Sequence, residues 1–225
     1  MVKSYIIVPV YNESAEILNL LLHDLIKMPF ETIVIDDGSS IPVKTIIKLP
    51  VTIITHRINL GQGAAIQTGL SYARIKNADY VITIDADGQH MSSEIPLILQ
   101  PLMNNETDVV FGSRFLEGSY HNASARKRIA FRIASWVNKV FIHMPITDTH
   151  NGFRGFNKTA ISKINLTENR MAHATELLVQ VKKSGLRFKE VPVSVRYTEY
   201  SRKKGQKGVD SIRIFLDLLL YKFFE

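Results

Sequence analysis

The chain contains no cysteine, which excludes disulfide bonds and thiolate metal sites and fits a reducing compartment. Long hydrophobic runs are also missing, since no apolar stretch reaches the roughly 18–20 residues that span a bilayer. The N-terminus leads directly into a predicted strand, so we expect no signal peptide. The 225 residues, 45% of them hydrophobic, are enough for one large α/β domain or one domain with an appendage.

Charge is distributed unevenly along the chain, whose net charge is +7. Residues 1–113 contain 7 Lys and Arg against 12 Asp and Glu, whereas residues 114–225 contain 21 against 9. The acidic half suits a bound cation, and the basic half suits an anionic membrane surface, a nucleic acid or simply solvent. The aromatic and basic residues do not alternate as they do in known nucleic-acid-binding motifs, so we do not expect nucleic acid to be the partner.

Short apolar runs alternate with segments of helical period in the first half of the chain. This alternation predicts βαβ units and hence an α/β fold, with a mostly parallel, Rossmann-like sheet flanked by helices. In the first helix we expect Ile17, Leu20, Leu21 and Leu25 to share the buried face. The predicted strands cover residues 5–10, 32–35, 51–55 and 80–84, and the predicted helices cover residues 16–28 and 61–75.

The second half of the chain is less regular. The helix predicted over residues 124–143 is amphipathic, with Trp136 on its apolar face and Arg128, Arg132 and Lys139 in a basic stripe, as in helices that lie in a membrane interface. The closing helix is almost wholly apolar but too short to span a bilayer, so we expect it to dock on a membrane, a partner, a second copy or the core. The further predicted elements are strands over 108–112 and 188–195 and helices over 174–183 and 211–224.

Two carboxylates stand two residues apart where the fourth predicted strand ends. Asp85 and Asp87 follow the apolar run 80–84, and the strand therefore carries both acids to one edge of the sheet. Carboxylate oxygens suit Mg²⁺ or Mn²⁺, which usually keep open positions for substrate phosphates. Polar residues 11–13 and 36–39 follow other strands, and ligands of open α/β sheets bind at the carboxyl ends of the strands. We therefore expect these three segments to form one site.

Four motifs occur in an order that is typical of one enzyme family. They are Val8-Pro9-Val10-Tyr11-Asn12-Glu13, Val34-Ile35-Asp36-Asp37-Gly38-Ser39, Asn59-Leu60-Gly61-Gln62-Gly63-Ala64-Ala65 and Asp85-Ala86-Asp87-Gly88-Gln89-His90. Over roughly residues 4–206 the chain resembles glycosyltransferase family 2, which has the GT-A fold. The segment Asp148-Thr149-His150-Asn151-Gly152-Phe153-Arg154 resembles the branch that contains dolichyl-phosphate mannose synthases and bacterial polyprenyl-phosphate glycosyltransferases.

The resemblance implies a divalent cation, Mg²⁺ or Mn²⁺, that is held by Asp85, Asp87 and Gln89, with His90 as a neighbour rather than a ligand. It also implies a nucleotide pocket after the first strand, where the ring of Tyr11 can stack on the base. The residues that are implied to bind the nucleotide sugar are Pro9, Tyr11, Glu13, Asp36, Asp37, Gly61, Gly63, Asp85, Ala86, Asp87, Arg196 and Arg202.

Plainer interpretations stay open for several of these residues. Asp-Gly-Ser is common turn chemistry, which would explain Asp36 and Asp37 without a ligand. Gly61 and Gly63 open a helix whose amides can face an anion, but a Gly-x-Gly pair is a weak sign of such a site. Many relatives carry lysine where this chain has Gln62, so the resemblance does not support a direct charge contact from this loop.

Arginines and one glutamate are implied to serve the acceptor and the chemistry. Arginine binds phosphate bidentately, and the residues expected at an acceptor phosphate are Arg114, Arg128, Arg132 and Arg154. A saccharide hydroxyl as acceptor needs a general base, for which Glu176 is the candidate. A lipid phosphate is already a nucleophile at neutral pH, and Glu176 would then organise arginines. The implied catalytic residues are Asp87, Arg114, Arg154 and Glu176.

Together these residues predict an inverting, metal-dependent glycosyltransferase. It would move a sugar from a nucleoside diphosphate sugar to a polyprenyl phosphate, dolichyl or undecaprenyl, as a peripheral protein on the cytoplasmic face of the membrane. Transfer to a saccharide hydroxyl in cell-surface polysaccharide synthesis is the alternative, and a non-catalytic sugar-nucleotide-binding protein is less favoured. We expect the GT-A domain to span residues 1–206 and an apolar appendage to span residues 207–225. A small membrane subunit or a second copy is the further partner considered.

Overall fold

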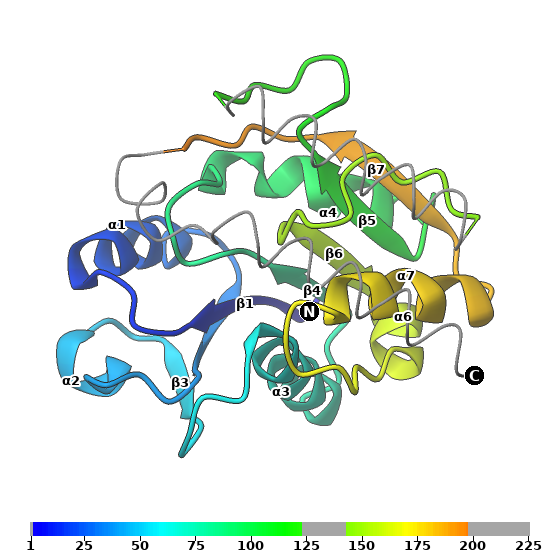
Figure 1. Ribbon diagram of the computed structural model, residues 1–225. Coiled ribbons are helices and arrows are strands. Elements are labelled where there is room, and N and C mark those ends of the chain that lie inside the picture. The colour runs from blue at the N-terminus through cyan, green and yellow to red at the C-terminus, as the bar shows by residue number, and fades with distance from the viewer. Residues whose placement is uncertain (1, 123–142, 198–225) are drawn as a thin grey trace.

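Seven strands form one mixed sheet, in the order β3-β2-β1-β4-β6-β5-β7, in the computed structural model (Figure 1). The structure describes residues 2–122 and 143–197. Among the described strands only β6 runs antiparallel to its neighbours, which are β4 and β5. The strands are β1 Ser4–Val10, β2 Glu31–Asp36, β3 Thr52–Thr55, β4 Tyr80–Thr83, β5 Val109–Ser113, β6 Arg154–Asn157 and β7 Phe188–Pro192.

Helices cover both faces of this sheet (Figure 1). Side chains alternate between the two faces of a strand, so Ile6 and Val8 of β1 pack with α1 and α4, while Ile7 packs with α3 and α7. All three side chains are fully buried, which explains why the central strand is a continuous apolar run. The helices are α1 Ala15–Leu25, α2 Val43–Ile46, α3 Gln62–Ile75, the 3₁₀ turn η1 Ser92–Glu94, α4 Ile95–Met103, α6 Lys158–Lys163 and α7 His173–Lys183.

The α/β fold with a mostly parallel sheet is confirmed, but the predicted buried face of α1 was partly wrong. Leu20 is 64% exposed, whereas the fully packed side chains are Leu18, Leu21, Leu22 and Leu25. These four follow the i, i+3, i+4, i+7 spacing of a helical stripe. The stripe begins at residue 18 because the chain enters the helix at Ala15, with Ser14 as the N-cap residue.

The short antiparallel strand β6 was not predicted, and it determines the composition of the site. Because β6 runs against β4, its first residue pairs with the last residue of β4, which places Arg154 opposite Thr83. On its other side Arg154 pairs with Phe111 of β5. The loop that precedes β6 therefore reaches the edge of the sheet where the parallel strands end, and it brings residues 148–153 beside the acids that follow β4.

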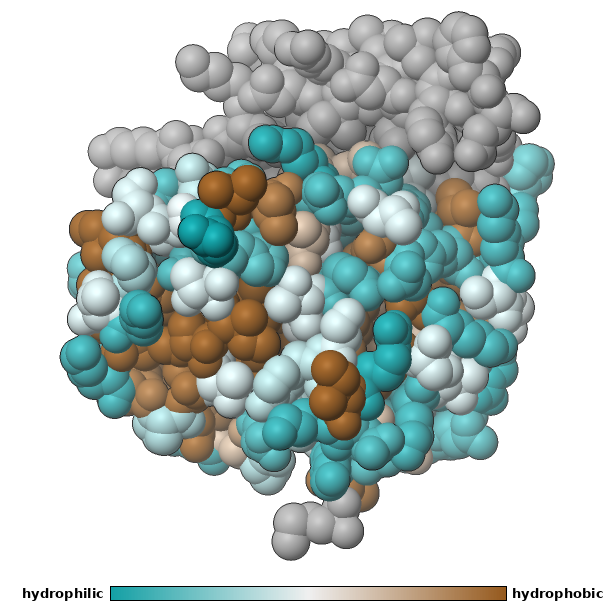
Figure 2. All heavy atoms as spheres, turned by 90° about the horizontal axis from the view of Figure 1, so that it is seen from below, coloured by the Kyte–Doolittle hydropathy of each residue, from teal (hydrophilic) through white to brown (hydrophobic). Residues whose placement is uncertain are grey.

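The predicted helices over 124–143 and 211–224 lie outside the described residues, as do Arg128, Arg132 and Arg202 and the expected boundary at residues 206–207. Within residues 2–122 and 143–197, every helix is too short or too polar to cross a bilayer. At the edge of the sheet, Ile53 and Ile54 of β3 are only partly buried. Seen from below, apolar side chains gather to the left of centre, on the side of α2 and β3 (Figure 2).

Candidate active site

Asp85 lies directly beyond the end of β4, against the backbone of Gly152. A Cβ atom on Gly152 would come within 2.2 Å of both oxygens of the Asp85 carboxylate, so only glycine leaves room for this acid. The Thr83 hydroxyl fixes the two segments together by donating a hydrogen bond to the Gly152 carbonyl over 2.7 Å. The loop before β6 therefore forms one wall of the acid site.

Each of the two acids is contacted by a carboxamide side chain. Gln62, the first residue of α3, donates from Nε2 to Oδ1 of Asp85 over 2.7 Å. Asp87 accepts hydrogen bonds from the backbone N–H of Gln89, over 3.1 Å, and from the Gln89 side chain. The structure thus brings Asp85, Asp87 and Gln89 together, as the sequence predicted, and adds Gln62.

The electrostatics of the acid pair favour a bound cation. Burial, followed by the negative charge of Asp87, raises the pKa of Asp85 to about 7, although Arg154, Arg114 and the Gln62 hydrogen bond act in the opposite direction. The positive charges of the two arginines therefore do not fully offset the effects of burial and of the Asp87 charge on Asp85. Two carboxylates and an amide form a donor set that fits Mg²⁺ or Mn²⁺. In the described part of the chain, no three Asp, Glu, His or Cys side chains come together as a metal cluster.

Arg114 follows β5 and forms a buried ion pair with Asp148. Its Nε atom lies 2.6 Å from Oδ2 of Asp148, and its backbone N–H donates to the same oxygen over 3.1 Å. The guanidinium also donates to the hydroxyl of Tyr197. Burial is the largest single influence on the pKa of Arg114 and lowers it, but the charges and hydrogen bonds of Asp148 and Tyr197 together outweigh burial, so the net pKa is raised. The Arg114 side chain is only 6% exposed. Through its two contacts it links the end of β5 to the loop before β6 and to the segment after β7.

Arg154 lies deeper than its predicted role at an acceptor phosphate would require. It is 2% exposed and donates to the carbonyls of Asn151, over 2.9 Å, and Thr149, over 3.0 Å. Burial lowers its pKa to about 10, while the charges of Asp85 and Asp148 oppose this change. Arg154 therefore holds the loop before β6 in place and supplies positive charge near Asp85, while its role at an acceptor phosphate stays a prediction.

Three histidines, of which His90 and His173 are buried, lie near these charged groups, and the sequence analysis gave no role to His150 and His173. Burial, and then the charge of Arg114, lowers the pKa of His90 to about 3; burial, and then Arg154, does the same for His173. The pKa of His150 is lowered by the same two causes as that of His173. All three rings are therefore neutral at physiological pH. The Nδ1 atoms of His90 and His150 are buried without a hydrogen-bond partner among the described residues.

The loop after β1 lies at the rim of the site. Tyr11 is 45% exposed, which leaves its ring accessible for stacking. Asn12 binds the loop after β2, since its N–H donates to the Ser39 hydroxyl over 3.0 Å and its Oδ1 accepts from the Ser40 N–H over 2.8 Å. Pro9 pairs with Ile35 inside the sheet. Glu13 accepts from the N–H of Ser14 over 3.3 Å, at the start of α1.

Asp36 and Asp37 do not present their carboxylates to a nucleotide in this structure. Asp36 is fully buried and accepts from the backbone N–H groups of Ser39 and Val43, over 3.0 and 2.9 Å. Asp37 is 2% exposed. It accepts from Asn59 Nδ2 and from the N–H groups of Leu60 and Gly61, and it contacts His56 Nδ1, all within 3.0 Å. The geometry supports the turn interpretation, because both acids hold loops in place.

Gly61 and Gly63 likewise serve close packing at the start of α3. A Cβ atom on Gly61 would lie 2.3 Å from the Asn169 carbonyl oxygen, and one on Gly63 would lie 2.0 Å from that of Glu168. Gly61 also has a φ of +111°, which favours glycine. Its N–H donates to Asp37 over 2.7 Å, and the N–H of Ala64 donates to the Asn169 carbonyl over 3.2 Å. These amides are engaged within the protein rather than by an anion.

The carboxylate of Glu176 is occupied by its own surroundings. It accepts from the N–H and hydroxyl of Thr167, from the N–H of Glu168 and from Gln180 Nε2, at 2.7 to 3.1 Å. No oxygen of Glu176 is directed to an arginine by these contacts. The geometry therefore supports a role in holding residues 167–168, and the role of general base or arginine organiser stays a prediction.

The segment that follows β7 returns to the acids. The N–H of Arg196 donates to the Gln89 carbonyl over 2.9 Å, and Val195 pairs with His90 and His121. Arg196 is exposed beside the Gln89 backbone, close to the predicted cation site. Asp148, Tyr197, Gln62 and Gly152 also belong to the site, although none of them was among the predicted site residues.

Comparison with known proteins agrees with this arrangement. The family model described as glycosyl transferase family 2 matches residues 5–164. An uncharacterized protein of Methanocaldococcus jannaschii is 31% identical over 98% of this chain and 92% of its own. A protein of Methanococcus voltae named UDP-N-acetylglucosamine–dolichyl-phosphate N-acetylglucosaminyltransferase is 32% identical over 97% of this chain and 95% of its own. The chain therefore belongs to glycosyltransferase family 2 and is a glycosyltransferase.

Solved structures confirm the fold. Glucosyl-3-phosphoglycerate synthase from Mycobacterium tuberculosis, crystallised with Mn²⁺, UDP and glucosyl-3-phosphoglycerate, superposes with a TM-score of 0.70. It is 16% identical, and the superposition covers 96% of this chain and 78% of that one. The expected GT-A fold is thereby confirmed. The expected resemblance to the polyprenyl-phosphate branch is confirmed by the relative from Methanococcus voltae.

Proposed function

We propose that this glycosyltransferase moves a sugar from a nucleoside diphosphate sugar to a polyprenyl phosphate, with inversion at the anomeric carbon. The observation that carries the proposal is the juxtaposition of the Asp85–Asp87 pair with the buried Arg114 at the carboxyl edge of the sheet. Such a site provides negative charge for a cation and positive charge for phosphates within one crevice. A transfer between two phosphorylated substrates requires both.

The cation, Mg²⁺ or Mn²⁺, would be held by Asp85, Asp87 and the Gln89 side chain. When bound, it would act as a Lewis acid that stabilises the charge developing on the leaving diphosphate. The chain itself fixes these ligands, because Gln62 and Gly152 set the position of Asp85 while the Gln89 N–H orients Asp87. The M. tuberculosis structure, which has the same fold, contains Mn²⁺ and UDP.

For the donor, the geometry supports the loop after β1 as the nucleotide side of the site. The exposed ring of Tyr11 can stack on the base, and Pro9 and Glu13 flank it. Asp36, Asp37, Gly61 and Gly63 would act indirectly, by holding the loops that frame this pocket. Arg196 stands beside Gln89 and is the described arginine best placed to reach the diphosphate.

For the acceptor, two observations support a lipid phosphate over a saccharide hydroxyl. The first is the similarity to the Methanococcus voltae relative, whose name gives dolichyl phosphate as its acceptor. The second is the engagement of Glu176, whose oxygens hold residues 167–168. A hydroxyl would need a base, whereas a phosphate monoester, with a second pKa near ~6, attacks without one. Arg114 and Arg154 are both buried and would attract the phosphate through their positive charge, while the roles of Arg128 and Arg132 at the acceptor stay predictions.

The acceptor also suggests where the protein works. A polyprenyl phosphate lies in the bilayer with its phosphate at the surface, so the enzyme must reach the membrane interface. We propose a peripheral position on the cytoplasmic face, where anionic lipids attract the basic second half of the chain. Docking on a small membrane subunit or on a second copy is a further element of this proposal.

A transfer assay tests the proposal. Purified protein with Mn²⁺ or Mg²⁺ is given radiolabelled UDP-, GDP- and dTDP-sugars in turn, with polyprenyl phosphate as acceptor, and products are partitioned between organic and aqueous phases. Label in the organic phase with one donor, and its absence from the Asp87→Ala variant, is the expected result. Donor hydrolysis without a lipid product would indicate that the acceptor is a saccharide hydroxyl. Full activity of Asp87→Ala would contradict the proposed cation site.

A further inference from the structure

Gln62 occupies a position from which one side chain can control the acid site. As the first residue of α3 it follows Gly61, whose N–H is anchored on Oδ2 of Asp37 at 2.7 Å. The backbone before Gln62 is therefore held by a buried carboxylate. From this fixed base the Gln62 amide reaches across to the end of β4 and donates to Oδ1 of Asp85 over 2.7 Å.

Asp85 is constrained on each side by a different group. Gln62 fixes Oδ1, and the backbone of Gly152 closes one wall, since even a Cβ atom there would lie 2.2 Å from either oxygen. The other oxygen, Oδ2, lies 3.8 Å from Nε2 of His90, which is longer than a hydrogen bond. Gln62 therefore holds Oδ1 of Asp85. Oδ2, which is too far from His90 for a hydrogen bond, is left for a ligand.

Both acids of the pair are held by neutral groups. Gln89 contacts Asp87 as Gln62 contacts Asp85. An amide N–H orients a carboxylate without cancelling its charge, whereas a lysine at this position would form an ion pair with Asp85. A fixed positive charge at that distance competes with a divalent cation for the same carboxylate. The choice of glutamine therefore preserves the negative charge of the site.

We propose that Gln62 is a positioning residue for the divalent cation: it orients Asp85 through Oδ1, directs Oδ2 to the ion and leaves the full charge of the acid pair for it. The inference rests on the proposed cation site at Asp85 and Asp87. Groups that orient metal ligands in this way typically change metal affinity by about 10–100-fold when they are removed.

The test is direct Mn²⁺ binding, measured from the electron paramagnetic resonance signal of free Mn²⁺, without any sugar donor. Gln62→Leu removes the hydrogen bond at similar size, and Gln62→Lys keeps a donor but adds charge. We expect about tenfold weaker binding for Gln62→Leu and a larger loss for Gln62→Lys. Gln100→Leu, an exposed glutamine of α4, is the matched control and should bind Mn²⁺ like the wild type.

A kinetic readout separates positioning of the ion from a general structural effect. If Gln62 acts through the cation, raising the Mn²⁺ concentration restores kcat in Gln62→Leu, and thermal unfolding without metal matches that of the wild type. Unchanged Mn²⁺ affinity in Gln62→Leu, while Asp87→Ala loses binding, would overturn this inference and leave the cation site intact. Absence of Mn²⁺ binding by the wild type would overturn both. Gln62→Ala provides a second deletion of the same bond if Gln62→Leu does not fold.

Discussion

Arg114 and Asp148 form a buried ion pair, 2.6 Å from Nε to Oδ2, which ties the end of β5 to the loop that precedes β6. The residues are 6% and 2% exposed, so solvent does not screen the pair. Asp148 also accepts from Asn151 Nδ2 over 3.2 Å, and Asn151 directly precedes Gly152, whose backbone lies against Asp85. The pair thus links the acceptor side of the site to the acid side.

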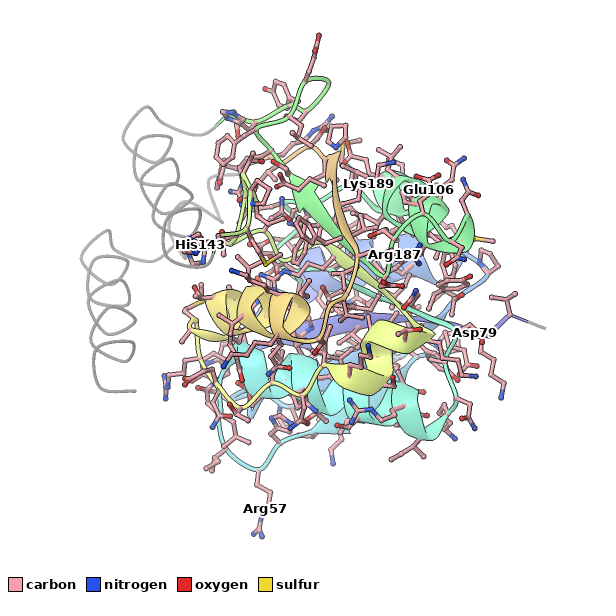
Figure 3. All side chains as sticks on the ribbon, turned by 90° about the vertical axis from the view of Figure 1, so that its right-hand side faces the viewer. Arg57, Asp79, Glu106, His143, Arg187 and Lys189 are labelled. Atoms are coloured by element: carbon pink, nitrogen blue, oxygen red, sulfur yellow. The ribbon has the colours of Figure 1, made fainter. Side chains whose placement is uncertain are left out.

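Removal of Asp148 should destabilise the protein strongly. Asp148→Ala leaves the Arg114 charge buried without its partner, which typically costs about 3–5 kcal/mol. Urea denaturation of both proteins at pH 7 measures this loss. The control is Lys189→Ala, which breaks an exposed pair at 2.7 Å with Glu106 (Figure 3). Exposed pairs contribute little, so this variant should unfold near the wild-type midpoint, and equal midpoints for the two variants would contradict the assigned role of Asp148.

The raised pKa of Asp85 should appear in the pH dependence of stability. The folded protein holds this proton with a pKa of about 7 against an ordinary value of 3.8. Between these values the native state binds more protons than the unfolded chain, so stability falls as the pH rises and levels off above about 7.

Asp85→Asn cannot ionise and should escape this loss. Its free energy of unfolding relative to the wild type should therefore rise from pH 4 to pH 7, by about 3 kcal/mol, and level off above pH 7. Metal-free unfolding curves across this range are the measurement. The same variant should lose transferase activity. A stability difference that does not depend on pH would show that Asp85 titrates normally.

Much of the fold followed from local patterns, as the first half of the chain illustrates. β1 and β4 are continuous apolar runs that end in polar motifs, and a strand buried on both faces requires such a run. β6 gave no such signal, because Arg154-Gly-Phe-Asn is short and begins with a charge. Its position depends on pairing with β4 and β5, which are distant in sequence. The register of a helix face, as with Leu20, also depends on where the helix begins.

The site was predicted in its residue types but less well in their roles. The spacing of Asp85 and Asp87 at a strand end was sufficient to place them, since the strand carries them to the edge. Asp37 and Glu176 could not be assigned in this way, because whether a carboxylate faces a ligand or a backbone amide depends on the packing of neighbouring loops. Gln62 and Gly152 carry no charge, and their importance appears only from their contacts with Asp85.

Gly152 should tolerate no side chain. Gly152→Ala places a Cβ atom 2.2 Å from both Asp85 oxygens. The acid or the loop must therefore move, and we expect at least a 10²-fold loss of transfer, as about 1 Å of misplacement can cause. Gly185→Ala is the control: its φ of +61° costs some stability, but nothing lies within 4 Å of the added atom. Its kcat should stay near that of the wild type, and an active Gly152→Ala enzyme would show that Asp85 need not occupy this position.

Glu176 should prove dispensable for chemistry. Glu176→Ala frees the N–H groups of Thr167 and Glu168, so we expect a loss of about 1–2 kcal/mol in stability. Since no proton transfer depends on it, kcat at a temperature where the variant is folded should fall by less than about tenfold, whereas loss of a general base costs about 10²–10⁴. A 10³-fold loss of kcat with normal stability would restore Glu176 as a base and favour a hydroxyl acceptor.

The acceptor is the central claim, and one comparison tests it directly. The wild-type enzyme, with Mn²⁺ and its preferred nucleotide sugar, is given polyprenyl phosphate or the same polyprenol without its phosphate, and label in the lipid phase is measured. The account predicts product with the phosphate alone, because the site supplies arginine for an anion and no assigned base for an alcohol. Equal transfer to the polyprenol, or transfer to a saccharide while polyprenyl phosphate stays unlabelled, would contradict it.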